Sequence, residues 1–157
     1  MPTKQCFDSN VGDEMCPGPG DVVAYHTQVP LNGLLEIPLN KPPKEEIFNI
    51  RHEIDITKFT TVTVKRPPGK KVLVVGKIML GIEYIAKVPD QKVHFAHWDI
   101  PFQVLIKNDD GSLLPTDFNL EEYIAHACVE HEEVQQVDER TITKEIVLLI
   151  WLQRIDN

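Results

Sequence analysis

The stretch KKVLVVGKIMLGIEYIAKVPDQKVHFAHWDIPFQVLIK, residues 70–107, decides the fold class of this chain. Its even positions are apolar or glycine from 72 to 86 and apolar from 96 to 106. Alternation with a period of two indicates strands that bury one face. A second stretch, VQQVDERTITKEIVLLIWLQ at 134–153, becomes apolar on both faces, which is typical of a strand covered on both sides.

Further β-type runs at 46–56, 59–65 and 122–137 complete the pattern. The segment EEYIAHACVEHEEV could also form a helix, but the flanking runs favour a strand. Gly76 or Gly81 is expected to mark a bulge, and Pro101 to lie on an edge or at a bulge because it has no N–H to donate. The sequence therefore predicts an all-β fold, an antiparallel β-sandwich with an extended N-terminal arm.

Three regions follow from the positions of proline and glycine. Residues 1–21, which carry Cys6, Cys16 and the breaking run CPGPGD, are predicted to form a flexible or extended arm. Residues 22–43 are predicted to hold short strands, a turn at LNG and a linker. The sandwich domain is predicted to span 44–157.

Charge and hydropathy exclude several classes of function. The net charge of −8 argues against nucleic acid as a partner, since phosphate binding needs a basic surface. No apolar run is long enough to span a membrane, and the N-terminus MPTKQCFDSN has no apolar signal region. We therefore expect a protein made in the cytoplasm without a signal peptide and with no membrane partner.

The charges themselves are segregated along the chain. Residues 65–92 are basic and residues 121–140 are acidic. They form either solvated faces or cross-strand pairs within one domain, or complementary surfaces on neighbouring subunits.

No pattern of catalytic or metal-binding residues stands out. His94 and His97, like His126 and His131, are an odd number of residues apart, so on a strand each pair is expected to face opposite ways. A helical 122–137 would instead bring His126 and Glu130 together as half a metal site. The glutamates around Cys128 would raise its pKa rather than activate it. We expect no enzyme activity, no cofactor and no metal.

The three cysteines cannot all pair within one chain. If Tyr123, Ala125, Ala127 and Val129 face inward, Cys128 faces outward. In an oxidising setting an outward thiol and two thiols on an arm suggest disulfides between subunits through Cys6, Cys16 and Cys128. The alternative is three free thiols in a reducing cytoplasm.

Residues from about 44 to 155 resemble the SPOCS domain, a β-rich domain of spore-forming Firmicutes. The likeness lies in a strand that ends in Pro-Gly-Lys, the run KVLVVGKIMLGIEYIAKVPDQKVHFAHWDIPF, and VDERTITKEIVLLIWL after an acidic strand. The resemblance implies a spore-associated protein, made in the mother cell and deposited on the spore surface, with a protein-binding or self-assembling role. It supplies no catalytic residues.

Together these observations lead to the hypothesis of a structural subunit of a spore-surface polymer, its partners being itself or spore-coat proteins. Strand pairing between subunits would build the polymer and disulfides would cross-link it. Candidate interface residues are Trp151, Glu130, Glu132, Lys70 and Lys71. The alternative is a monomeric or dimeric module that docks onto a spore-coat morphogenetic protein. A sugar-binding or enzymatic sandwich is less favoured, because Trp98 falls on an apolar strand face.

Overall fold

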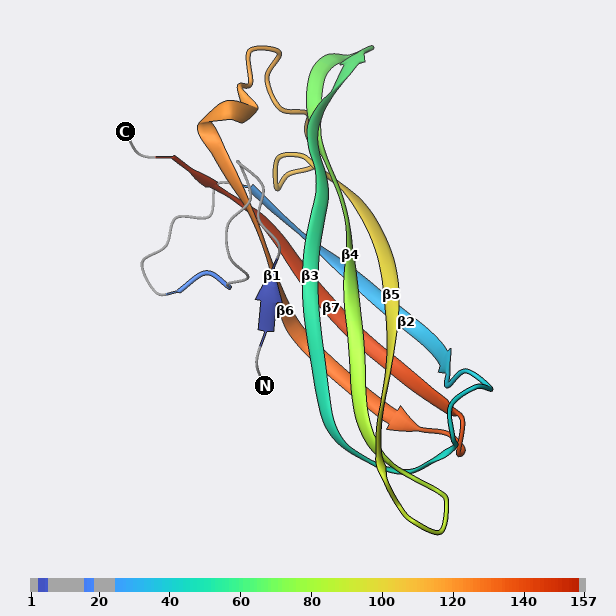
Figure 1. The fold of residues 1–157 in the computed structure, drawn as a ribbon. Helices are drawn as coiled ribbons and strands as arrows, with labels where there is room; N and C mark the ends of the chain where they lie inside the picture. Colours follow the sequence, from blue (N-terminus) through green and yellow to red (C-terminus); the bar gives the residue numbers. More distant parts are fainter. Residues whose placement is uncertain (1–2, 6–15, 19–24, 156–157) are drawn as a thin grey trace.

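The computed structural model describes residues 3–5 (backbone only), 16–18 and 25–155. Its elements are β1 (Thr3–Gln5), β2 (Tyr25–Glu36), β3 (Lys44–Lys65), β4 (Pro68–Ala86), β5 (Val93–Ile106), the 3-10 turn η1 (Leu120–Glu122), β6 (Tyr123–Gln136) and β7 (Thr141–Arg154). One sheet has the strand order β1-β3-β4-β5 and the other β2-β7-β6, and the two pack face to face (Figure 1). All pairs are antiparallel except β1 with β3. The predicted all-β sandwich is confirmed.

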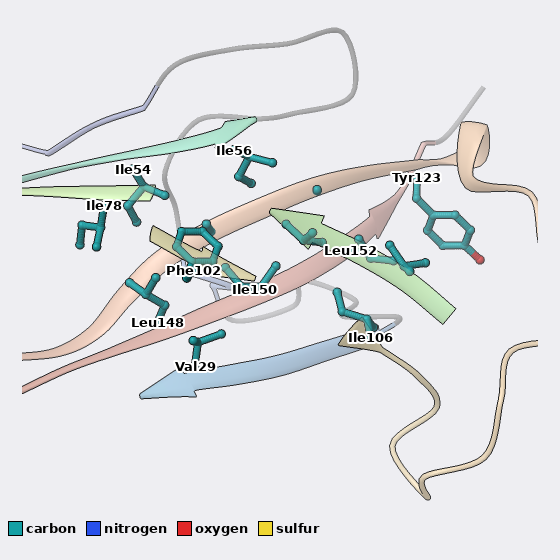
Figure 2. Packing of buried hydrophobic residues seen from close by; sticks show 14 of the residues in the cluster. Val29, Ile54, Ile56, Ile78, Phe102, Ile106, Tyr123, Leu148, Ile150 and Leu152 are labelled. Atoms are coloured by element: carbon teal, nitrogen blue, oxygen red, sulfur yellow. The ribbon is translucent and has the colours of Figure 1, made fainter. Parts of the chain in front are cut away.

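The core lies between the two sheets and follows the alternation seen in the sequence. Every even position of β4 from Val72 to Ala86 is buried, because β4 is paired on both sides and faces the other sheet. Figure 2 shows Ile54, Ile78 and Phe102 of one sheet packed against Leu148 and Ile150 of the other. This shared apolar layer holds the sandwich together, since burial of apolar side chains is the main favourable term in folding.

The predicted boundary at residue 44 is wrong, because β2 belongs to the sandwich. This strand pairs with β7 over its whole length, from Tyr25 against Leu152 to Glu36 against Thr141. The turn expected at LNG does not form, and the strand runs straight through Gly33. A Cβ on Gly33 would be in ordinary contact with the Lys144 ammonium, at 3.5 Å. The backbone instead favours glycine at this position, because its φ is +155°.

A bulge does occur at Gly76, but the extra residue is on β3. Ile56 pairs with Gly76 and Lys58 with Val75, so Thr57 is the inserted residue. A Cβ on Gly76 would overlap the carbonyl oxygen of Asp55 and lie 2.9 Å from the Phe102 ring. Glycine is needed here because the kinked β3 backbone approaches β4 closely.

Two further expectations are confirmed. Pro101 lies on β5, an edge strand. Residues 123–136 form strand β6 and not a helix. On a strand, His126 and Glu130 are separated by about 13 Å along the chain at ~3.3 Å per residue. The half metal site that depended on a helix therefore does not form.

Candidate assembly surface

The segment at residues 16–18 is attached to the second sheet by a covalent bond. Cys16 and Cys128 form a disulfide with their Cα atoms 5.2 Å apart and a sequence separation of 112. We predicted that both thiols cross-link neighbouring subunits, and the structure instead joins them within one chain. The strand geometry explains why: Cys128 lies on the outward face of β6, as expected, where residue 16 of the same chain meets it. Cys6 lies outside the described residues.

The outward face around this disulfide is buried. Cys128, Leu149 and Trp151 form a small apolar cluster on the side of β6 and β7 away from the main core. The His126 ring stacks on Trp151 with 4.6 Å between ring centroids, and its Nε2 lies 2.9 Å from the Gln153 side-chain oxygen. Trp151 was predicted to be a surface interface residue, but its exposed fraction is 0%. That prediction is wrong for the isolated chain, because this face is already covered.

β1 adds to the outer edge of β3 as a parallel strand. Thr3, Lys4 and Gln5 pair with His52, Glu53 and Ile54. This covers three of the 22 residues of β3. In the part of the chain that the structure describes, no other strand pairs with this edge. The edge of β3 therefore accepts a main-chain segment, and among the described residues no strand pairs with the rest of it.

A buried hydrogen-bonded pair joins β3 to β6 beside that edge. His52 Nδ1 lies 2.8 Å from Glu132 Oε2, and the two side chains are only 8% and 13% exposed. Glu132 was predicted to be a subunit interface residue. It is instead directed inward, because the bulge between Val129 and His131 reverses the alternation of β6 beyond that point.

The other predicted interface residues are dispersed over the molecule. Glu130 is exposed and accepts a 2.9 Å hydrogen bond from Gln28 Nε2 on the β2-β7-β6 sheet. Lys70 donates to the Phe118 carbonyl at 3.1 Å, and Lys71 is half-buried near the start of β4 on the other sheet. Glu130 and the two lysines lie on different sheets and do not form a single patch. A contact between Glu130 of one subunit and these lysines of another would therefore join two different faces of the molecule.

Some charges of the two segments are paired within the chain. Lys87 of the basic segment lies 3.4 Å from Glu139 of the acidic segment, and Lys77 lies 3.5 Å from Asp99 on the adjacent strand. Lys77 and Asp99 pair across β4 and β5, but Asp99 lies outside the acidic segment. Lys87 and Glu139 pair between two loops, and for them the alternative of charge pairing within one domain is realised. All four side chains are well exposed, so each pair contributes little to stability.

Two lysines are buried, and their environments differ. Lys44 donates from Nζ to the backbone oxygens of Asp138 and Thr141. Burial lowers the pKa of Lys44, and the nearby carboxylates of Asp138 and Glu139 partly offset this. Burial also lowers the pKa of Lys144, which faces the interior next to Gly33.

One cluster of potential ligands was missed in the sequence. His131 Nε2 lies 3.9 Å from a carboxylate oxygen of Glu133 and 3.9 Å from one of Glu145, on the exposed outer face of β6 and β7. Two facts concealed it. Glu145 reaches the site by cross-strand pairing with Glu133, and the β6 bulge places His131 on the same face as His126 rather than the opposite one. All three side chains are exposed, as surface carboxylates and imidazoles commonly are.

Together these features define a class: a small all-β sandwich whose N-terminal segment is attached by a disulfide and by strand pairing. A family model described as "SipL, SPOCS domain" matches residues 43–127, just over half of the chain, and the chain therefore belongs to the SPOCS-domain family. The match covers β3, β4 and β5 and ends within β6. The family associates the chain with spores. No curated protein and no solved structure matches the chain. Among the described residues, no helix is long and apolar enough to cross a membrane.

Proposed function

We propose that this protein is a structural subunit of a spore-surface polymer, such as a fibre, coat or exosporium layer, and that its subunits join by β-strand pairing. The observation that supports this most directly is the edge of β3, which already accepts a parallel strand. Strand addition contributes main-chain hydrogen bonds without any catalytic group. A contact of this kind that does not close on itself generates a filament.

The four edges of the two sheets differ in how well they are protected. β5 carries Pro101 and β2 carries Pro30, and neither residue has an N–H for an incoming strand. β6 has a bulge and a run of charged residues, both of which discourage pairing. β3 has no proline in its 22 residues.

The last eight residues of β3, Lys58–Lys65, form the least protected part of these four edges. From Lys58 to Lys65 the pairing with β4 is continuous, so the strand has no bulge there. Between the two lysines the sequence FTTVTV has no charge. Among described residues, these positions make backbone pairs only with β4. This is the type of edge that proteins usually protect against association, and leaving it open favours a role in assembly.

Disulfides between subunits remain part of the proposal, with Cys6 as the residue that starts the bond. Because Cys16 and Cys128 are already paired, Cys6 is the remaining cysteine of the chain. Its thiolate can attack one sulfur of that disulfide in a neighbour, forming a new S–S bond while the other sulfur leaves as a thiolate. The exchange conserves the number of disulfides, so it requires no external oxidant.

The test is negative-stain electron microscopy of the purified protein with and without reductant, beside a Cys6→Ser variant. We expect regular fibres or sheets in the oxidised wild type, and assemblies of the Cys6→Ser variant that dissociate more readily in denaturant. Dispersed particles of single-domain size in every condition would refute the polymer.

One observation favours a second function. The disulfide and β1 both fold the N-terminal segment back onto its own sandwich, as a self-contained monomer would. Such a monomer suits a module that docks onto a spore-coat morphogenetic protein. Removing residues 1–15, which keeps Cys16 and its bond to Cys128, distinguishes the two functions, since it should abolish a polymer and leave the binding of a docking module intact.

A further inference from the structure

The N-terminal segment has one fixed point and one exchangeable contact. Cys16 is covalently bound to Cys128 of its own sandwich. β1 is held to β3 by main-chain pairing over Thr3–Gln5. Residues 6–15 connect the two points, and fully extended they reach at most about 35 Å at ~3.3–3.6 Å per residue. This reach is comparable to the width of a small domain, so β1 can reach a second sandwich while Cys16 stays in place.

We infer that β1 of one subunit exchanges onto the β3 edge of a second copy of this chain, pairing there in the same parallel register. This inference rests on the proposed function and names the strand, the edge and the direction of the contact between subunits. The acceptor site consists of His52, Glu53 and Ile54, which in this structure pair with β1 of the same chain. We call this arrangement, with β1 on its own β3, the closed form. A second copy offers the same backbone groups, so exchange reproduces every main-chain contact of the closed form.

The energetics favour exchange once subunits are concentrated. Pairing over three residues makes few main-chain hydrogen bonds, and each contributes only modestly to stability. In the closed form, the short connection to Cys16 presents β1 to its own β3 at an effective concentration on the order of millimolar. Subunits crowded on a surface, or aligned by further pairing along Lys58–Lys65, match or exceed that value. The closed form then loses its advantage, and the exchanged form dominates where the local concentration of subunits exceeds the effective concentration within one chain.

The exchange is directional, which suits a polymer. Each chain donates one β1 and offers one β3 edge, and these are different surfaces of the same subunit. A donor–acceptor contact between different surfaces is heterologous, so it propagates unless the rotation between subunits closes a ring. Where the Cys16–Cys128 bond is intact, it keeps the donor segment attached to the body of its own subunit. Where Cys6 of one subunit has exchanged with the disulfide of another, the new S–S bond itself joins the two subunits.

The test uses paired cysteines in a Cys6→Ser background that retains Cys16 and Cys128. One chain carries Lys4→Cys and a second, with a different mass tag, carries Glu53→Cys. These positions are Cα partners in the β1–β3 register, which suits disulfide formation. The matched control pairs Lys4→Cys with Asp117→Cys, an exposed position between β5 and η1. Peptide mapping checks that Cys16–Cys128 is intact.

After mild oxidation of the mixed chains, we expect a two-chain product joining residues 4 and 53, with a yield that rises with protein concentration and exceeds that of the control pair. A chain carrying both Lys4→Cys and Glu53→Cys should then shift from an internal to an intermolecular bond as concentration rises. A purely internal bond at every concentration, with no two-chain product above control, would overturn the inference. Fibres seen by microscopy without that product would refute the exchange of β1 but not the proposed polymer.

Discussion

Reduction of the Cys16–Cys128 disulfide provides the most direct test of how the N-terminal segment stabilises the sandwich. The bond closes a loop across 112 residues of sequence, which includes β2, β3, β4 and β5. We expect that reducing it lowers the free energy of unfolding substantially, because the unfolded chain regains the freedom that the cross-link removes.

The expected magnitude follows from the loop length. In the chain-entropy treatment a loop of this size contributes about 5 kcal/mol at 25 °C, and measured values generally fall somewhat below this limit. We therefore expect a loss of about 3–5 kcal/mol. With a urea m-value of about 2 kcal/mol/M, the unfolding midpoint should fall by roughly 2 M.

The assay is urea unfolding of a Cys6→Ser variant with and without reductant, followed by circular dichroism. Replacing both Cys16 and Cys128 by alanine gives the control, whose midpoint should be low and unaffected by reductant. A midpoint shift below about 0.3 M on reduction would refute the reasoning, since it would mean that the cross-link leaves the unfolded ensemble nearly unconstrained.

Three further predictions concern the interior. Lys144→Met should raise stability at neutral pH by up to about 1 kcal/mol, because it removes a charged group whose side chain is largely buried and whose pKa is lowered by that burial. The folded pKa of Lys144 lies below 10.5, so wild-type stability should rise with pH up to about 10.5 relative to the variant, and equal pH profiles would contradict this. Gly76→Ala should cost about 2–4 kcal/mol in thermal unfolding, and Gly81→Ala less, because the new methyl group meets backbone at the first position and only movable side chains at the second. Glu132→Gln should cost about 1–3 kcal/mol in urea unfolding by weakening the buried pair with His52, whereas exposed Glu130→Gln should stay within about 0.5 kcal/mol.

The fold was predictable wherever burial controls the pattern. β4 and β5 alternate strictly because each faces the opposite sheet, and that alternation is visible in the sequence. β2 was harder to recognise as part of the sandwich, because Pro30 and Gly33 are local turn signals. Pairing with β7 overrides them, and no local pattern reveals which distant strand will provide that pairing.

The candidate site was predictable only in part. The outward position of Cys128 followed from alternation on β6, but its partner at Cys16 depends on where the chain brings residue 16. One inserted residue in β6 turned Glu132 inward and His131 outward, because a bulge reverses every side chain beyond it. Trp151 was expected at an interface because the sequence cannot show that its outward face is covered.

The disulfide also determines how the molecule bears mechanical load. A pull on the N-terminal segment is transmitted through the Cys16–Cys128 bond directly into β6 and its ladder with β7. The pull therefore does not reach β2 through the backbone that follows residue 16, because the disulfide carries it to β6 instead. In a polymer whose subunits are joined by their N-terminal segments, the disulfide would therefore prevent a pull on that segment from separating β2 from β7.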